Sequence, residues 1–344
     1  MSNNNRNTGT IGRRRLLQAG AAGLGGIAMP WVARPAGAQS QLAGKTIGFS
    51  TFWVTAEWNR QQRQGVIDTA QKFGFKCIVL DAENHPDKEV SNLEDLVTRG
   101  VDAILINTYF TEAIAPAVRE IDHAKIPIIV LSSALAGNVD WTVQLGADTP
   151  AAARTAGEYF VKRLNGKGNV VDIDGSPGST VNQERGRGRH AVIDQAPGIK
   201  VVGHVMADYD RFKALKGMED MLQAHDRIDG VYTHSEAMAL GAIQAIREAG
   251  REKEMFVTGY DGVAPDCLKA IYDGELAMVM SYHPFGVEAV EVAARVFQGK
   301  PTPKNIVFAC PMIDKSNILD YYDPATGKGK AGPSRLATLN LPDK

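Results

Sequence analysis

Residues 76–107, KCIVLDAENHPDKEVSNLEDLVTRGVDAILIN, carry the pattern from which the architecture of the chain is predicted. Two almost continuously apolar runs, 76–80 and 103–106, are typical of strands buried on both faces of a parallel sheet. Between them, apolar residues recur three or four positions apart, as on the buried face of a helix: Val90, Leu93, Leu96 and Val97. Gly100 ends this helix, so the stretch predicts a strand, a helix and a second strand.

The same unit recurs on both sides of this stretch. Upstream, a strand at 46–50 precedes a helix that begins near Glu57, and downstream another helix leads to a strand at 128–131. A second series follows Gly146, with a helix at 149–164 and then strands at 169–173, 201–205, 231–233, 256–258 and 276–280. A last helix ends at Gly299, before a strand at 305–309. We therefore predict an α/β protein with two doubly wound parallel-sheet lobes, for which 344 residues at 44% hydrophobic composition suffice.

Charge and motifs exclude several classes of function. The 38 Lys and Arg residues nearly balance the 39 Asp and Glu residues, and a formal net charge of -1 provides no field that would attract nucleic acid or an acidic membrane. The first predicted strand is not followed by GxGxxG, and there is no P-loop motif, so no nucleotide cofactor is predicted. GxSxG and HExxH are also missing, so the motifs predict neither catalytic residues nor a metal.

The three cysteines, Cys77, Cys267 and Cys310, are an odd number, lie far apart and form no CxxC pair. This spacing indicates neither a disulfide framework nor a zinc site. A bridge between Cys267 and Cys310 is one interpretation in an oxidising compartment. The commoner alternative is that all three are small buried hydrophobic side chains.

The first 38 residues predict export. Gly12-Arg13-Arg14-Arg15-Leu16-Leu17-Gln18 opens an apolar stretch that ends at Ala36-Gly37-Ala38, as in a removable twin-arginine signal. Pro30 and Arg34 interrupt this stretch, which is too short to anchor the protein in a membrane. No cysteine follows it, so we expect a soluble periplasmic protein without a lipid anchor, beginning near Gln39.

The topology predicts where a ligand would bind. In open parallel sheets, ligands bind in the crevice beyond the carboxyl ends of the strands, and two facing lobes would join their crevices into a cleft. Loops are usually polar because they face water, so some polar residues are expected there even without a ligand. The residues that follow predicted strands are nevertheless candidates, and they are polar or aromatic: Asn107, Tyr109, Ser132, Ser133, Asp174, Asp208, Tyr209, His234, Ser235, Asp261, Tyr282 and His283.

Seven short motifs resemble the ribose-binding protein family of periplasmic receptors, over nearly all of residues 45–315. Each motif alone is weak, and their order and spacing make the resemblance specific. Repressors with the same fold carry an N-terminal helix-turn-helix, where this chain has an export signal. The motifs are Val79-Leu80-Asp81-Ala82-Glu83-Asn84, Asp95-Leu96-Val97-Thr98-Arg99-Gly100, Ile104-Leu105-Ile106-Asn107, Gln183-Glu184-Arg185-Gly186, Ala207-Asp208-Tyr209-Asp210-Arg211, Glu236-Ala237-Met238-Ala239-Leu240-Gly241-Ala242 and Gly259-Tyr260-Asp261-Gly262.

The resemblance implies a monomeric, non-enzymatic receptor that closes two lobes around a sugar and delivers it to the permease of an ABC transporter. It also implies a three-segment hinge, with crossings near Gly146, Tyr282 and Cys310. The expected boundaries are 45–146 with 283–309 for the N-terminal lobe, 147–282 with 310–320 for the C-terminal lobe, and 321–344 for a peripheral tail.

The resemblance further implies aromatic ligand contacts. Trp58 stands where the family has an aromatic residue that packs on the sugar ring, and Asn59 stands where a second one is usual. Trp53 lies in the preceding loop, which is longer than in the ribose receptors, and Tyr209 matches another ring contact. An aromatic face contacts the C–H side of a sugar and excludes water. The alternative for Trp58 is core packing at the start of a helix.

Asn107 and Asp261 match polar ligand contacts of the family. A carboxylate can accept two hydroxyl hydrogen bonds, whereas the alternative for Asp261 is to cap the helix that begins near Ala264. Gln183 stands at the family's ligand-facing arginine position, so Arg185 is interpreted as a structural ion-pairing residue.

Departures from the family bear on the ligand. Ser132 and Ser133 replace an Asp-Arg pair, and Ser235 and Tyr282 replace amides. Together with Gln183, these changes remove two guanidinium groups, so the site becomes more neutral and more aromatic. We therefore expect a small neutral ligand other than ribose: another sugar, a polyol or a small cyclic compound with an apolar face.

Two other functions are compatible with the same fold. An exported hydrolase would use Asp174 or Asp208 with His234, although no motif supports this constellation. A sensory receptor would use the same cleft and would signal to a chemoreceptor or kinase instead of a permease.

Overall fold

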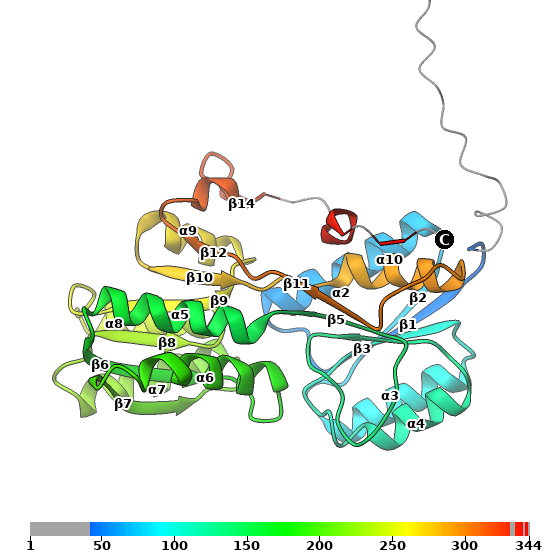
Figure 1. Cartoon of the computed structure of the whole chain (residues 1–344), viewed down its shortest axis with the longest axis horizontal. Coiled ribbons are helices and arrows are strands. Elements are labelled where there is room, and N and C mark those ends of the chain that lie inside the picture. The colour runs from blue at the N-terminus through cyan, green and yellow to red at the C-terminus, as the bar shows by residue number, and fades with distance from the viewer. Residues whose placement is uncertain (1–41, 331–333, 340, 343–344) are drawn as a thin grey trace, which may run out of the picture.

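The computed structural model describes residues 42–330, 334–339 and 341–342, so the predicted export signal lies outside the described residues. It contains two lobes, each built on a six-stranded sheet with helices on both faces (Figure 1). The predicted fold class is thus confirmed. No described helix combines the length and the apolar character needed to cross a membrane.

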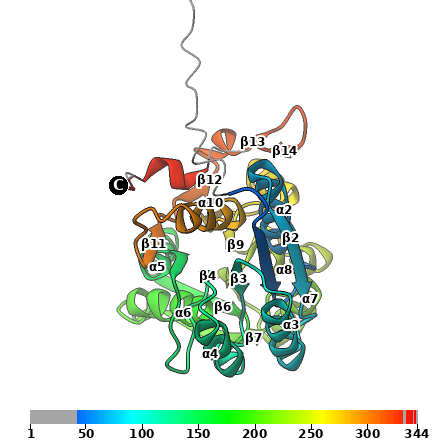
Figure 2. The same cartoon turned by 90° about the vertical axis from the view of Figure 1, so that its right-hand side faces the viewer.

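The sheet of the first lobe is entirely parallel and has the strand order β11-β5-β4-β3-β1-β2. Figure 2 looks onto this lobe, with β11 at one edge and β2 at the other. The strands are β1 (Thr46–Thr51), β2 (Lys76–Asp81), β3 (Ala103–Asn107), β4 (Ile128–Leu131), β5 (Val143–Ala147) and β11 (Asn305–Phe308). The covering helices are α2 (Glu57–Phe73) with α10 (Gly286–Phe297) on one face, and α3 (Pro86–Thr98) with α4 (Ala115–His123) on the other.

The apolar run in β3 shows why a continuous run of apolar residues predicts a central strand. Ala103 and Leu105 join the core shared with α10, whereas Ile104 and Ile106 join the core under α3 and α4. Because successive side chains of a strand point to opposite faces, only an uninterrupted apolar run satisfies both cores.

The second lobe repeats this plan with the strand order β12-β10-β9-β8-β6-β7. Its strands are β6 (Lys167–Asp174), β7 (Gly198–Met206), β8 (Gly230–Thr233), β9 (Phe256–Asp261), β10 (Met278–Ser281) and β12 (Met312–Asp314), of which only β12 runs antiparallel to its neighbour. Helices α5 (Thr149–Arg163) and α6 (Thr180–Ile193) pack together on one face. The other face carries α7 (Arg211–Ala224), α8 (Glu236–Glu248) and α9 (Pro265–Asp273).

The main chain passes between the two sheets three times among the described residues. The crossings lie between β5 and α5, between β10 and α10, and between β11 and β12. The C-terminal segment also packs on both lobes. Tyr322, from a small hairpin of β13 (Tyr322–Asp323) and β14 (Lys328–Gly329), is buried in the core of the second lobe, whereas Leu336 is buried in that of the first. This segment is therefore less peripheral than expected.

Two strands of the six-stranded sheets were not predicted, and the cysteines are unpaired. The sequence of β5, Val143–Ala147, contains Gln144 and Gly146 and so lacks a continuous apolar run, and β12 has only three residues. All three cysteines are free thiols, so the bridge between Cys267 and Cys310 is not formed.

Candidate ligand-binding cleft

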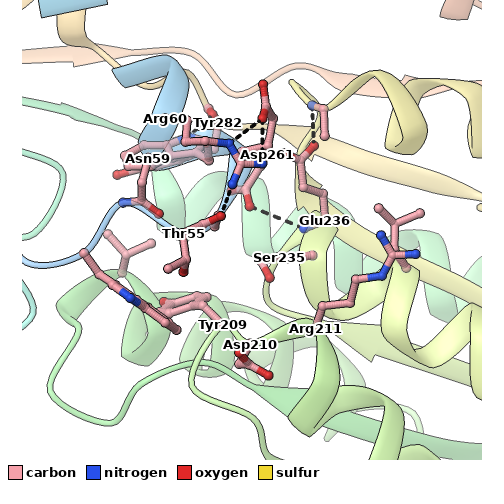
Figure 3. Close-up of a pocket in the computed structure, with 18 of the residues that line it drawn as sticks. Thr55, Asn59, Arg60, Tyr209, Asp210, Arg211, Ser235, Glu236, Asp261 and Tyr282 are labelled. Atoms are coloured by element: carbon pink, nitrogen blue, oxygen red, sulfur yellow. Dashed lines mark hydrogen bonds and ion pairs between the residues drawn. The ribbon is translucent and has the colours of Figure 1, made fainter. Parts of the chain in front are cut away.

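A cavity of about 490 Å³ lies between the lobes, within the size range typical of small-molecule sites. The first lobe contributes the loop before α2 and the first turn of that helix, and the second lobe contributes the loops that follow its strands (Figure 3). Eight of the eleven predicted contact residues line it: Trp53, Trp58, Asn59, Ser132, Tyr209, Ser235, Asp261 and Tyr282.

Trp58 lines the cavity and also belongs to the core of the first lobe, so its side chain combines core packing with a place in the cavity wall. Its indole Nε1 donates a hydrogen bond to the carbonyl oxygen of Tyr282 at 2.8 Å, and the two rings lie 5.9 Å apart. Only 8% of Trp58 is exposed. The side chain is therefore held in one orientation, with one part packed in the core and another part facing the cavity.

Two tyrosines meet across the cleft. Tyr109 follows β3 of the first lobe, Tyr209 follows β7 of the second, and their ring centroids lie 5.1 Å apart. Tyr109 in turn lies against Phe52, and the Tyr209 hydroxyl is 3.2 Å from Oγ of Ser179. Tyr109 was a candidate because it follows a strand, but the resemblance did not select it.

Arg185 is the most buried charge in the cavity wall, with 2% of its surface exposed. Its Nη2 lies 3.3 Å from Asp261 Oδ1, and its Nη1 donates a hydrogen bond to the carbonyl oxygen of His234. The guanidinium also lies 4.1 Å from the ring centroid of Tyr260 and 4.8 Å from that of Tyr282. Arg185 therefore makes the ion pair expected of it, and it also faces the cavity.

The placement of Gln183 in the cleft was wrong. Gln183 does not line the cavity, and its Nε2 donates a hydrogen bond to the carbonyl oxygen of Pro177 on the exposed side of α6. The reason is helical phase. Val181 and Arg185, four residues apart, share the side of α6 that faces the cavity, whereas a residue two positions along a helix is rotated by about 200°.

Asp261 does not cap α9. Its Oδ2 accepts a hydrogen bond from the backbone N–H of Glu236 at 3.3 Å, at the start of α8. Glu236 itself accepts hydrogen bonds from the N–H groups of Val263, at 2.8 Å, and Ala264, at 3.0 Å, and so occupies the N-terminus of α9. Asp261 is thus left to pair with Arg185 and to face the cavity.

Burial dominates the ionisation of both carboxyl groups. It raises the pKa of Asp261, although the Arg185 guanidinium acts in the opposite direction. Burial raises the pKa of Glu236 to about 8, and the nearby Asp261 carboxylate adds to this shift.

Asn107 and Ser133 do not line the cavity. Both are fully buried at the carboxyl edge of the first sheet, after β3 and β4. In the described part of the chain, the side-chain amide of Asn107 and the hydroxyl of Ser133 have no hydrogen-bond partner. Ser132, which precedes Ser133 in the chain, does line the cavity.

The mouth of the cavity contains residues that the sequence argument did not select. Arg60 lies on α2 beside Glu57, and their side chains are 2.9 Å apart. On the second lobe, Arg211 pairs with Asp266 at 3.0 Å, and Asp210 caps α7 through the N–H of Lys213 at 2.8 Å. Thr55 completes the rim. All these residues lie at helix starts or in the loops before them. The rule that ligands bind beyond the carboxyl ends of strands would have selected them if it had been applied to whole loops and to the first turns of helices.

The constellation proposed for a hydrolase does not face the cleft. His234 is completely buried, and its Nε2 lies 3.3 Å from Asp174 Oδ1, but neither residue lines the cavity. Asp208 pairs with Lys213 at 2.7 Å on the surface. These residues are therefore not arranged around the cavity between the lobes.

Two lobes, three crossings and a cavity between the lobes define a binding protein of the periplasmic type. The chain matches the periplasmic binding protein domain family over residues 47–301 and therefore belongs to this family. The ribose import binding protein of Bacillus subtilis is 35% identical over 264 residues, which are 76% of this chain and 84% of that protein. The predicted resemblance to the ribose-binding protein family is thus confirmed.

Two further relatives cover more of the chain. A xylitol-binding protein of Mycolicibacterium smegmatis is 29% identical over 312 residues, which are 88% of this chain and 85% of that protein. The crystal structure of a galactofuranose binding protein superimposes with a TM-score of 0.76 at 28% identity, covering 80% of this chain and 96% of that one.

Proposed function

We propose that this protein captures a small neutral polyhydroxylated ligand, a sugar or polyol other than ribose, and delivers it to the permease of an ABC transporter. In this proposal the twin-arginine signal at 1–38 is removed after export, and the mature protein acts as a periplasmic monomer without a cofactor. Relatives that bind ribose, xylitol and galactofuranose support the ligand class.

The observation that carries the proposal is the compensation of charge around the cavity. Each charged side chain that lines it is paired with an opposite charge or placed at a helix N-terminus. A charged ligand would therefore leave water without finding an unpaired partner, at a considerable cost in free energy, whereas a neutral ligand avoids that cost. The pairs are Glu57 with Arg60, Arg185 with Asp261, and Arg211 with Asp266, and the capping residues are Asp210 and Glu236.

Aromatic faces and hydrogen-bond acceptors supply the recognition. Trp58 and Tyr209 offer apolar surface to the C–H side of a sugar, and Asp261 offers carboxylate oxygens to its hydroxyl groups. Ser132 and Ser235 add short hydroxyls. Ser132 and Ser133 stand where an Asp-Arg pair would hold ribose, which is why we propose a different polyhydroxylated compound.

Closure of the lobes would trap the ligand. Contacts across the cleft include the rings of Tyr109 and Tyr209, and a hydrogen bond of 3.0 Å from Gln61 Nε2 to the carbonyl oxygen of Val263. We propose that the lobes rotate about the three crossings and that the ligand favours closure through contacts with both lobes at once. The transporter would then recognise the closed form.

Thermal unfolding of residues 39–344 against a panel of pentoses, hexoses and polyols tests the proposal. A ligand at about a hundred times its dissociation constant should add roughly 2.7 kcal/mol to the free energy of unfolding. A shift with one compound class, without consumption of that compound, supports the receptor. Consumption of the compound would instead support an enzyme, and no shift with any compound would contradict the proposed ligand class.

Trp58→Ala tests the cleft itself. Loss of the indole surface should lower the affinity for the ligand found by this panel by more than about tenfold, which corresponds to about 1.4 kcal/mol of binding free energy. Trp141→Ala is the matched control, because Trp141 packs beside the core of α3 and α4 and does not line the cavity. Isothermal titration of both variants should separate them, and equal affinities would contradict the assignment of the cleft.

A further inference from the structure

A second group of ionisable side chains lies outside the cleft, on the α5 and α6 face of the second sheet. Asp172 and Asp174 are two residues apart on β6 and therefore share one face. His204 lies on the neighbouring strand β7, and His234 follows β8 on the other side. Ligand atoms of Asp172, Asp174 and His204 all lie within 4.8 Å of one another.

An irregularity in the sheet brings His204 into this group. The pairing of β6 with β7 shifts between Val170 and Val171, so that Asp172 pairs with His204. With unbroken register from Val170 and Val201, Asp172 would pair with Gly203, and His204 would point to the opposite face of the sheet. Bulges often redirect a side chain in this way next to functional sites.

The orientation of His234 is determined by its hydrogen bonds. Its Nδ1 lies 2.6 Å from Asn182 Oδ1, and the same oxygen accepts a hydrogen bond from the N–H of Gly175 at 2.7 Å. Because this oxygen is an acceptor, Nδ1 of His234 must carry the proton, and Nε2 then presents a lone pair. The neutral form of the ring is the one that binds a metal ion.

This lone pair faces carboxylate oxygens. Nε2 of His234 lies 3.7 Å from Asp172 Oδ1 and 3.3 Å from Asp174 Oδ1, and it is fully buried without a hydrogen-bond partner among the described residues. Oδ1 of Asp172 likewise has no partner there. Arg189 pairs with the other oxygen, Asp172 Oδ2, and so compensates only one of two carboxylates. Acceptors that face one another in a buried space need a proton or a metal ion between them.

We propose that Asp172, Asp174, His204 and His234 bind a divalent transition-metal ion of the Zn²⁺ type. Ligands bound to Zn²⁺ at about 2.0–2.1 Å in tetrahedral geometry are about 3.3 Å apart. Nδ1 of His204 lies 3.6 Å from an oxygen of each carboxylate, and Nε2 of His234 lies 3.3 and 3.7 Å from the others. Ligand atoms of Asp172, Asp174 and His204 already lie within 4.8 Å of one another, whereas His234 lies outside this group and has to move closer when the ion binds.

The surroundings complete such a site. Asn182 fixes the tautomer of His234, and Arg189 holds Asp172, as the outer partners of metal ligands commonly do. The His204 side chain is 54% exposed, so an ion can enter from the solvent at the edge of the sheet. Four protein ligands leave no open position, so the ion is structural and ties β6, β7 and the loop after β8 together.

The test uses tag-free residues 39–344 without sugar, treated with a chelator and then titrated with Co²⁺, with Zn²⁺ as competitor. We expect one equivalent of Co²⁺ to bind, with the visible absorption of a four-coordinate ion, and Zn²⁺ to displace it. His204→Ala, at a half-exposed position, should weaken binding at least about tenfold. Asp174→Asn should weaken it as well.

His190→Ala is the matched control. His190 stacks beside His204 with ring centroids 6.3 Å apart, but its Nδ1 faces Asp194 at 3.2 Å and its Nε2 lies 2.8 Å from Arg189 Nη2, so it points at no proposed ligand. This variant should bind Co²⁺ as the wild type does. The proposal is overturned if the wild type binds no stoichiometric Co²⁺, or if His204→Ala and His190→Ala bind it equally. Because no sugar is present, either result leaves the proposed function of the cleft untouched.

Discussion

Asp261→Asn should reveal how strongly the buried ion pair organises the cleft. The side chains of Arg185 and Asp261 are almost completely buried. Unit charges at their separation of 3.3 Å interact by about 5 kcal/mol at an effective dielectric constant of about 20. Loss of one partner leaves an uncompensated buried cation, which typically costs about 3–5 kcal/mol. The two tyrosine rings retain part of the stabilisation of Arg185, so we expect a loss of about 3 kcal/mol.

Urea unfolding of the ligand-free protein measures this loss, and a double-mutant cycle isolates the pair. Arg185→Met with Asp261→Asn removes both charges and should be less destabilised than the sum of the two single variants by at least about 1 kcal/mol. The pair Arg211 and Asp266, at 3.0 Å but half-exposed, is the control, and its coupling should be at most about 1 kcal/mol. Equal coupling for the two pairs would refute the reasoning.

Two further predictions concern burial and space. Burial raises the pKa of Glu89 to about 8, against a hydrogen bond from Thr108 that lowers it. Between about pH 4.5 and pH 8, the folded protein therefore keeps a proton on Glu89 that the unfolded chain has released. The contribution of Glu89 to the free energy of unfolding is consequently lost as pH rises towards about 8. Urea unfolding at pH 5.5 and 8 should show a smaller pH dependence for Glu89→Gln than for the wild type, and identical slopes would contradict this. In Gly175→Ala, the new Cβ would lie 2.2 Å from the ring of Tyr209, which must move, so ligand affinity measured by isothermal titration should fall at least about tenfold. Gly186→Ala, with its nearest neighbour at 3.8 Å, should retain the affinity, and a similar loss in both variants would argue against the role of Tyr209.

The fold was predictable from sequence wherever a strand is buried on both faces. Ile104, Leu105 and Ile106 illustrate this, because two separate cores require apolar residues at every position. The same rule misses β5, where Gln144 and Gly146 interrupt the run, and it misses β12, which is too short for any periodicity. Their places in the sheets follow from tertiary pairing with β4, β11 and β10, which a local pattern does not contain.

The candidate site was predictable to the extent that topology places it. Strand ends identify Tyr209, Ser235 and Asp261, because ligands bind beyond the carboxyl ends of the strands in open parallel sheets. The choice between Gln183 and Arg185 depends instead on helical phase. Ser179 caps α6 by accepting a hydrogen bond from the N–H of Asn182 at 3.2 Å. A cap identified from sequence would have shown that Val181 and Arg185, one turn apart, share a side of α6 that Gln183 does not.

Arg185 also joins the cleft to the four residues proposed to bind a metal ion. Its Nη2 reaches Asp261 in the cleft, and its Nη1 reaches the carbonyl oxygen of His234, whose ring turns the other way, towards Asp172 and Asp174. An ion that fixes the ring of His234 would thereby fix the loop that carries this carbonyl group, and with it the position of Arg185. A cavity wall that is already ordered before the ligand binds lowers the entropy cost of binding. Rigidity of the second lobe and affinity of the cleft are therefore expected to depend on the same short segment after β8.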